Sequence, residues 1–164
     1  MNREDVDWAG YWPAAVTPFS EKGDLDLGSL SALVEQYVER GMHGVVINGT
    51  CGEWFSQSMD ERHATAEAAV AAAAGRLRVL VGCTANTAEN VRVLASNAFR
   101  TGADGVLVSP PPYIKLFPNE VFAWYEEIGD LVQAPLAIYN WPHGTGVDID
   151  TELASRLADL PSVV

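Results

Sequence analysis

The sequence predicts an α/β fold with a parallel β-sheet, and three observations lead to it. Short apolar runs suited to buried strands alternate with longer segments of helical periodicity. The runs recur about every 30 residues, which is the length of one strand–helix unit. Polar side chains stand where nearly every run ends: Thr17, Thr50, Cys83, Ser109 and Tyr139. Because the carboxyl ends of parallel strands share one edge, we expect these side chains to lie near one another.

The apolar runs set the order of the expected strands. These are residues 10–19, 45–47, 79–81, 105–108 and 136–139, and a further apolar run begins at 162–164. Helices are expected between them, from capping residues and apolar spacing. Asp26 is expected to cap the first, and Ser58 with Glu61 and Asn86 with Glu89 have the spacing of capping boxes. Apolar spacing predicts two more helices, across residues 121–128 and from residue 150 onward.

Two parallel-sheet architectures fit this alternation, an open doubly wound sheet and part of an eightfold barrel. A flavodoxin-like sheet carries a phosphate loop after its first strand, but residues 17–19 read Thr-Pro-Phe, a poor phosphate cradle. Polar groups at several strand ends favour the (β/α)8 TIM barrel, which typically needs about 250 residues. We therefore expect residues 1–164 to be a single domain, an incomplete barrel that ends after about five strand–helix units and the start of strand six.

The composition argues against several classes of partner. With 10 basic and 22 acidic residues the formal net charge is −12, which disfavours nucleic-acid phosphates and anionic membranes. The Ala-rich run at 64–74 is too short to cross a bilayer, and residues 1–7 have no apolar signal-peptide core. Cys51 and Cys83 suggest no disulfide framework, and the histidines lack metal-ligand spacing. We expect a cytoplasmic protein with no metal, nucleic-acid or membrane partner.

A glycine-containing turn follows the second expected strand. Gly49 and Gly52 allow a tight turn with positive φ and a close approach of the backbone to a ligand. Successive N–H groups in such a turn form a concave nest for an anion. On residue type alone, Thr50 and Cys51 have a structural alternative, which is to cap the turn and pack under the next helix.

Four short motifs also occur in a fixed order along the chain. They are Val16–Phe19, Gly49–Glu53, Pro111–Tyr113, and Tyr139–Pro142 followed by Gly146. With these motifs the chain resembles, over essentially all of its length, the N-terminal two-thirds of the dihydrodipicolinate synthase / N-acetylneuraminate lyase family of (β/α)8 barrels. The resemblance implies a lyase or aldolase in which a lysine forms a Schiff base with pyruvate or a related 2-oxo acid, without a cofactor.

The resemblance implies roles for single residues. The expected catalytic residues are Tyr139, which passes protons between the substrate and the nitrogen centre, and Thr50, whose hydroxyl assists it. On residue type alone, Tyr139 is also a plain core aromatic. The expected substrate-binding residues are Gly49, Thr50, Cys51, Tyr113 and His143, of which the turn residues would hold the carboxylate.

Two of the departures from the family pattern bear directly on the activity. Gly144 stands where members that make dihydrodipicolinate carry an arginine for the second substrate's carboxylate, so we expect a different 2-oxo acid substrate, such as a sugar acid. The family's nucleophilic lysine lies on strand six. Neither Lys22 nor Lys115 matches that position, and the lysine is expected beyond Val164.

Two functions of different class remain open at this point. The first is the Schiff-base lyase, with a small-molecule 2-oxo acid partner and a homo-oligomeric state. The alternative is a catalytically inactive partial barrel that serves as a binding or oligomeric interaction module, because open strand edges favour association. A third hypothesis, a flavodoxin-like binder of a phosphorylated cofactor, is disfavoured because the phosphate loop is lacking.

Overall fold

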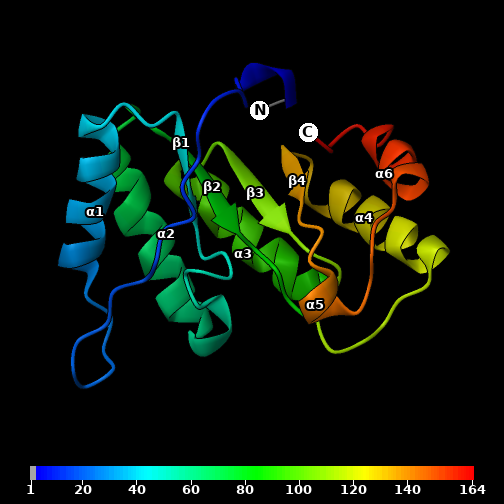
Figure 1. The fold of residues 1–164 in the computed structure, drawn as a ribbon, viewed down its shortest axis with the longest axis horizontal. Helices are drawn as coiled ribbons and strands as arrows, with labels where there is room; N and C mark the ends of the chain where they lie inside the picture. Colours follow the sequence, from blue (N-terminus) through cyan, green and yellow to red (C-terminus); the bar gives the residue numbers. More distant parts are fainter. Residues whose placement is uncertain (1–2) are drawn as a thin grey trace.

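The computed structural model describes residues 3–164, and its strands form one parallel sheet in the order β1-β2-β3-β4 (Figure 1). The elements are η1 (Arg3–Asp5), α1 (Leu27–Glu39), β1 (Gly44–Ile47), η2 (Trp54–Ser56), α2 (Met59–Ala73), β2 (Arg78–Gly82), α3 (Ala88–Thr101), β3 (Gly105–Val108), α4 (Pro118–Val132), β4 (Leu136–Ile138), α5 (Pro142–Thr145) and α6 (Thr151–Ala158). Successive helices α1 to α4 pack on one another in chain order, as the strands do.

Isolated parallel bridges extend this order on both sides of the sheet. Ala14 pairs with Val46 of β1 on one side, and Val163 pairs with Leu136 of β4 on the other. Six parallel segments are therefore neighbours in chain order. This arrangement matches the first six strands of a (β/α)8 barrel and confirms the expected partial barrel.

The first expected strand, residues 10–19, is wrong as a continuous strand. Its pairing with β1 is limited to two hydrogen bonds, from Ala15 N–H to the Val46 carbonyl and from Val46 N–H to the Pro13 carbonyl, each 2.9 Å. Proline carries no N–H, so Pro13 and Pro18 cannot donate to a ladder. The segment follows β1 for one bridge and then leaves it.

Most helix starts agree with the sequence patterns. Asp26 caps α1 by accepting from Ser29 N–H at 2.9 Å, and Asp150 caps α6 in the same way. Ser58 and Glu61 form the reciprocal capping box of α2. The four-residue helix α5 and the two 3-10 helices were not expected, because such short elements have no periodicity to reveal them.

The cap of α3 differs by one residue from the expected one. Thr87, not Asn86, has the extended cap conformation, and its hydroxyl accepts from Asn90 N–H at 3.2 Å. Glu89 does not close a capping box. Its carboxylate instead accepts from Arg92 Nε at 2.7 Å, because an i,i+3 guanidinium is within reach on the helix surface.

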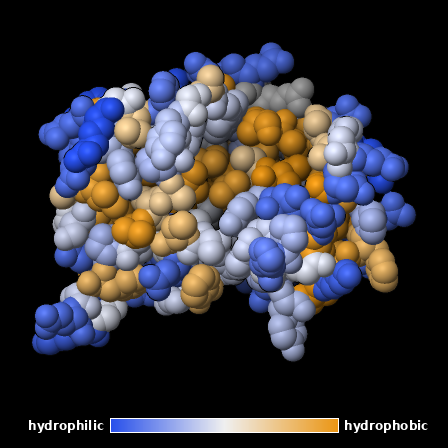
Figure 2. Space-filling model, in the orientation of Figure 1, coloured by the Kyte–Doolittle hydropathy of each residue, from blue (hydrophilic) through white to orange (hydrophobic). Residues whose placement is uncertain are grey.

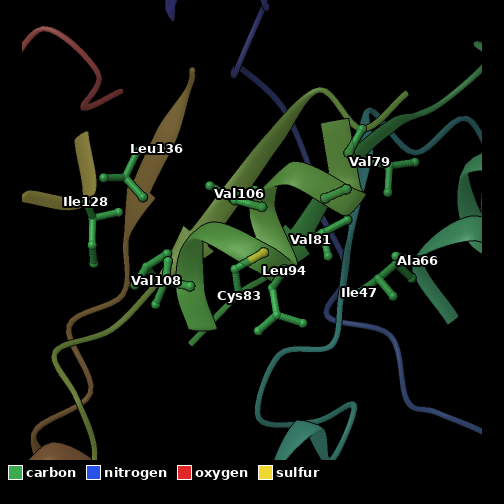
Figure 3. Close-up of a cluster of buried hydrophobic side chains, with 14 of the residues drawn as sticks. Ile47, Ala66, Val79, Val81, Cys83, Leu94, Val106, Val108, Ile128 and Leu136 are labelled. Carbon is green, nitrogen blue, oxygen red and sulfur yellow. The ribbon is translucent and has the colours of Figure 1, made fainter. Parts of the chain in front are cut away.

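Alternate residues of each strand point toward the helices and form the core. Figure 3 shows Cys83, Val106 and Val108 in a cluster of buried side chains with Leu94 of α3 and Ile128 of α4. The opposite face of the sheet is less covered, since Val46 and Leu107 on it are only half-buried. Figure 2 shows apolar atoms in the middle of the face that Figure 1 presents, with hydrophilic residues around them.

Two tryptophans cover the amino ends of the strands. Trp8 and Trp12 stack with ring centroids 5.6 Å apart. Trp12 lies directly over Gly44 and Trp8 over Gly105, where a Cβ would meet the indole rings at 2.2 and 2.6 Å. Aromatic packing therefore closes this end of the sheet, and the polar groups lie at the other end. None of the described helices is long and apolar enough to cross a membrane.

Candidate active site

The turn after β1 exposes backbone donors at the carboxyl edge of the sheet. Gly52 N–H donates to the Gly49 carbonyl at 3.0 Å, and Glu53 N–H donates to the Thr50 carbonyl at 3.1 Å. Among the described residues, the N–H groups of Thr50 and Cys51 donate to no protein acceptor. Two successive free N–H groups in a tight turn are suited to an anion such as a carboxylate.

Buried polar contacts hold the turn in this shape. Asn48 has a left-handed φ of 56°, which asparagine tolerates better than most residues. Its amide donates to the Arg62 carbonyl at 3.0 Å and its Oδ1 accepts from the Thr65 hydroxyl at 2.9 Å. On the other side, the Thr17 hydroxyl and Gln57 Nε2 both donate to the Gly52 carbonyl at 2.7 Å.

Gly82 lets the turn rest on the end of β2. A Cβ at this position would lie 2.1 Å from the carbonyl oxygen of Asn48 and 3.2 Å from Gly49 N. Only a residue without a side chain permits this backbone contact. By contrast, a Cβ on Gly49 would make an ordinary contact of 3.5 Å with Val46.

A buried arginine lies beneath the turn. Arg62 is 4% exposed, and its Nη1 and Nη2 donate to the carbonyls of Thr84 at 3.0 Å and Gly82 at 2.9 Å. Its guanidinium stands 5.1 Å from the centre of the Trp54 ring, and its Nε has no hydrogen-bond partner among the described residues. No ion pair with a carboxylate is found for it in residues 3–164, so its positive charge is not neutralised there.

The nearby thiol does not neutralise that charge either. Burial raises the pKa of the Cys83 thiol to about 12, although the Arg62 charge acts in the opposite direction. Burial also lowers the pKa of Arg62, but from an ordinary value so high that the guanidinium stays protonated.

The sequence pattern did not single out Arg62. The helical spacing of α2 could have indicated that Arg62 is buried, because it lies on the same face as the buried residues Thr65, Ala66 and Ala69.

The hydroxyl groups of Thr50 and Tyr139 meet across the sheet. Their oxygen atoms are 3.2 Å apart, and either can be the donor. Tyr139 follows β4 directly, and its N–H donates to the Val108 carbonyl at 2.9 Å, which fixes its backbone. Its ring stacks on Trp141 with centroids 6.0 Å apart and an interplanar angle of 3°. Such a hydroxyl pair can pass a proton between a bound molecule and a second group.

The structure thus brings Gly49, Thr50, Cys51 and Tyr139 to one edge. Tyr113 is 98% exposed with a φ of 78°, on the β3–α4 loop, and among the described residues no hydrogen bond joins it to the hydroxyl pair. His143 is exposed on α5.

No cluster of three or more His, Cys, Asp or Glu side chains among the described residues is placed to hold a metal ion. A cavity of about 710 Å³ lies elsewhere, between α4 and residues 160–162, and none of the expected site residues lines it.

Parallel strands in chain order, with a polar site at their carboxyl ends, define part of a (β/α)8-barrel protein. The chain belongs to the dihydrodipicolinate synthetase family, whose model matches residues 7–164. This confirms the resemblance found in the sequence motifs.

Its similarity to single relatives covers nearly the whole chain. It is 38% identical to an uncharacterised DapA-like lyase of Rhizobium meliloti, over 97% of this chain and 53% of the relative. It is 37% identical to a 4-hydroxy-tetrahydrodipicolinate synthase of Phenylobacterium zucineum, over 98% of this chain and 54% of the relative. The chain therefore spans about half the length of the curated relatives that it matches.

Solved structures also match nearly all of this chain over about half of their own length. The chloride-inhibited dihydrodipicolinate synthase of Acinetobacter baumannii, complexed with pyruvate, matches with a TM-score of 0.91 and 35% identity, over 94% of this chain and 53% of that chain. The E. coli K12 prophage protein YagE, also in complex with pyruvate, matches with a TM-score of 0.88 and 32% identity, over 93% of this chain and 51% of that one.

Proposed function

We propose that this chain supplies the carboxylate cradle and the proton relay of a Schiff-base lyase or aldolase that acts on pyruvate or a related 2-oxo acid. The observation that carries the proposal is the Thr50–Tyr139 hydroxyl pair at 3.2 Å, directly beside the free N–H groups of Thr50 and Cys51. One group of atoms can bind an anion, and the other can move a proton next to it. The match to two proteins solved with pyruvate supports a 2-oxo acid as the ligand.

The cradle suits a carboxylate for electrostatic reasons. Two successive N–H groups of the turn have no acceptor among the described residues, and hydrogen bonds to an anion are stronger than those between neutral groups. The unneutralised guanidinium of Arg62 lies below the turn, where it adds positive potential without occupying the binding surface. The side chain of Cys51 is exposed and is a weaker hydrogen-bond donor than a hydroxyl, so the backbone carries most of the binding.

The relay suits the proton transfers that Schiff-base chemistry requires. The lysine amine attacks the ketone carbon, and the carbonyl oxygen leaves as water after it has been protonated. The resulting iminium withdraws electrons from the adjacent carbon, which can then lose a proton or break a carbon–carbon bond. The hydroxyls of Tyr139 and Thr50 are hydrogen-bonded to each other, so in the proposed reaction Tyr139 exchanges protons with the substrate and Thr50 holds its hydroxyl in place.

The test is reductive trapping on the protein of the complete reading frame. Borohydride with pyruvate should add a covalent mass to one lysine that follows Val164 in the sequence, and peptide mapping should locate it. Borohydride alone is the control. A complete protein that forms no adduct with pyruvate or other 2-oxo acids would contradict the mechanism, as would a continuation without a lysine on strand six.

A second candidate, a non-catalytic binding module, is favoured by one observation. Lys22 and Lys115 are exposed in loops, and in the described part of the chain neither is hydrogen-bonded to Thr50 or Tyr139. For the 164-residue chain alone we therefore expect pyruvate binding without a borohydride adduct. Chemical-shift changes of the Thr50 and Cys51 amides on addition of pyruvate would detect this binding, and unshifted amides would exclude it.

We also propose that the protein forms a homo-oligomer in the cytoplasm. The β3–α4 loop presents the apolar side chains of Tyr113, Ile114 and Phe117, which are 98%, 54% and 73% exposed. Such a cluster is typical of a contact surface. The two thiols, Cys51 and Cys83, are free, as is usual in a reducing compartment. Sedimentation analysis should show a multimer that Phe117→Ser weakens, whereas a stable monomer would refute self-association.

A further inference from the structure

One backbone carbonyl of the turn after β1 accepts two side-chain hydrogen bonds. The carbonyl oxygen of buried Gly52 accepts from the Thr17 hydroxyl and from Gln57 Nε2, each at 2.7 Å. Gln57 Nε2 also lies 3.3 Å from the Thr17 hydroxyl oxygen, and its Oε1 lies 3.4 Å from the hydroxyl of Thr65. Thr17 is 6% exposed and Gln57 is half-buried. The side chains of Thr17 and Gln57, which we call the Gly52 clamp, therefore fix the direction of this carbonyl.

The clamped carbonyl begins a chain of peptide groups that ends in the cradle. The Gly52 carbonyl and the Glu53 N–H belong to one trans peptide unit, so they point in opposite directions. Glu53 N–H donates to the Thr50 carbonyl at 3.1 Å. That carbonyl shares a second trans peptide unit with the Cys51 N–H, which therefore points away from Glu53. The Cys51 N–H is one of the two cradle donors that have no acceptor among the described residues.

The Gly52 clamp acts on the Cys51 N–H in two ways. The dipoles of the two linked peptide units are aligned, with their positive end at this N–H, and donors at the other end of such a chain polarise the groups along it. The second effect is on direction. Glu53 has a left-handed φ of 53°, which is strained for a residue other than glycine. Hydrogen bonds on both sides of its peptide group hold this conformation, and with it the direction of the Cys51 N–H.

We propose that Gln57 and Thr17 are positioning residues for the 2-oxo acid, which act through two peptide units to aim the Cys51 N–H and strengthen it as a donor to the carboxylate. The proposal rests on the proposed function, because that function supplies the carboxylate. It also gives Thr17, in the Val16–Phe19 motif, a role in shaping the turn after β1.

The experiment compares two ketones on the protein of the complete reading frame. The methyl hydrogens of pyruvate exchange with heavy water when the iminium loses a proton and the enamine takes up a deuteron, so deuterium uptake gives kcat and KM without a second substrate. Pyruvamide is the same ketone with an uncharged amide in place of the carboxylate. Gln57→Met removes one donor of the Gly52 clamp at similar length, and Thr17→Val removes the other at similar size. In each variant we expect kcat/KM for pyruvate to fall about tenfold relative to pyruvamide, mainly through KM.

Two control variants separate positioning from a purely structural role. Thr17→Ser keeps the hydroxyl donor and should retain most of the preference for pyruvate over pyruvamide. Gln36→Met makes the same change as Gln57→Met on the exposed surface of α1, and should leave kcat and KM unchanged. Turnover is expressed per site that borohydride traps at saturating pyruvate, so misfolded protein is not counted. A structural role alone would change the turnover of both ketones equally.

An unchanged pyruvate-to-pyruvamide ratio in Gln57→Met or in Thr17→Val would overturn the proposal. Equal falls in Thr17→Ser and Thr17→Val would also overturn it, because the serine keeps the donor. Gln57→Met, at a half-buried side chain, keeps the test valid if Thr17→Val folds poorly. A failure of the proposed function gives a different result, since the unmodified protein would then show neither a borohydride adduct nor deuterium uptake with pyruvate.

Discussion

Gly82→Ala is expected to displace the cradle although residue 82 lies outside the turn, at the end of β2. The new Cβ would lie 2.1 Å from the carbonyl oxygen of Asn48 and 2.6 Å from its carbonyl carbon. Both partners are backbone atoms, so no side chain can rotate to relieve the overlap. The turn and the end of β2 must separate by roughly 1 Å to reach ordinary contact distance. The N–H groups of Thr50 and Cys51 move with the turn.

The size of the effect follows from two opposing terms. Overpacking of this kind costs about 1–3 kcal/mol. Replacing glycine lowers the conformational entropy of the unfolded chain, which raises the free energy of unfolding by about 0.4–1 kcal/mol. We expect the free energy of unfolding to fall by roughly 1–2 kcal/mol in total.

Urea denaturation of the complete protein measures this change as a lower midpoint at an unchanged m-value. Gly49→Ala is the matched control, because its Cβ would make an ordinary 3.5 Å contact with Val46 and its φ is not left-handed. The control should change stability by less than about 0.5 kcal/mol. An equal loss in both variants, or none in Gly82→Ala, would refute the account of the turn resting on β2.

Three further predictions concern the groups around the cradle. Arg62→Met should lower the free energy of unfolding by about 2–4 kcal/mol, because two buried carbonyls lose charge-assisted donors; a urea midpoint equal to that of the unmodified protein would argue against this role. Burial raises the pKa of Cys83 from 9.0 to about 12, so the unfolded chain loses that proton first. The contribution of this thiol to the free energy of unfolding should be constant below pH 9 and decline as the pH rises toward 12. Cys83→Ala should make this decline shallower in a pH series of urea denaturation. The decline that remains is due to buried Tyr125, whose pKa burial also raises. Tyr139→Phe should reduce turnover by about 10²–10⁴-fold and stability by less than about 1 kcal/mol, since among the described residues the hydroxyl of this half-buried tyrosine is bonded to Thr50 alone. Steady-state kinetics showing full turnover would exclude the relay.

Local signals were sufficient for much of the fold. The apolar run at 105–108 coincides with β3, and the Ser58–Glu61 pattern opens α2 as a capping box. Both depend on residues that are close in sequence. The cap of α3 was misplaced by one residue because Asn86 and Thr87 are both good N-caps, and residue type alone does not choose between them.

Periodicity and composition did not predict the contacts between residues that are distant in the sequence. The Thr50–Tyr139 bond joins residues 89 positions apart, and it was anticipated only through the family motifs that contain them. The first strand failed because pairing of residues 10–19 depends on which backbone donors meet β1, and Pro13 offers none. Arg62 was overlooked because a charged residue on an Ala-rich helix is normally exposed, whereas here the carbonyls of Gly82 and Thr84 receive it.

The tryptophans of this protein lie at different ends of the sheet, so their fluorescence and circular-dichroism signals report on different regions. Of the five tryptophans, these two lie stacked at the amino ends of the strands, while Trp54 lies beside Arg62 and Trp141 beside Tyr139 at the other end. Trp124 donates to the Ser109 carbonyl from α4. Emission changes on ligand addition should therefore arise from Trp54 and Trp141. The exciton coupling of the stacked pair in circular dichroism would separately report whether the amino end stays closed, so a single unlabelled sample can distinguish binding from opening.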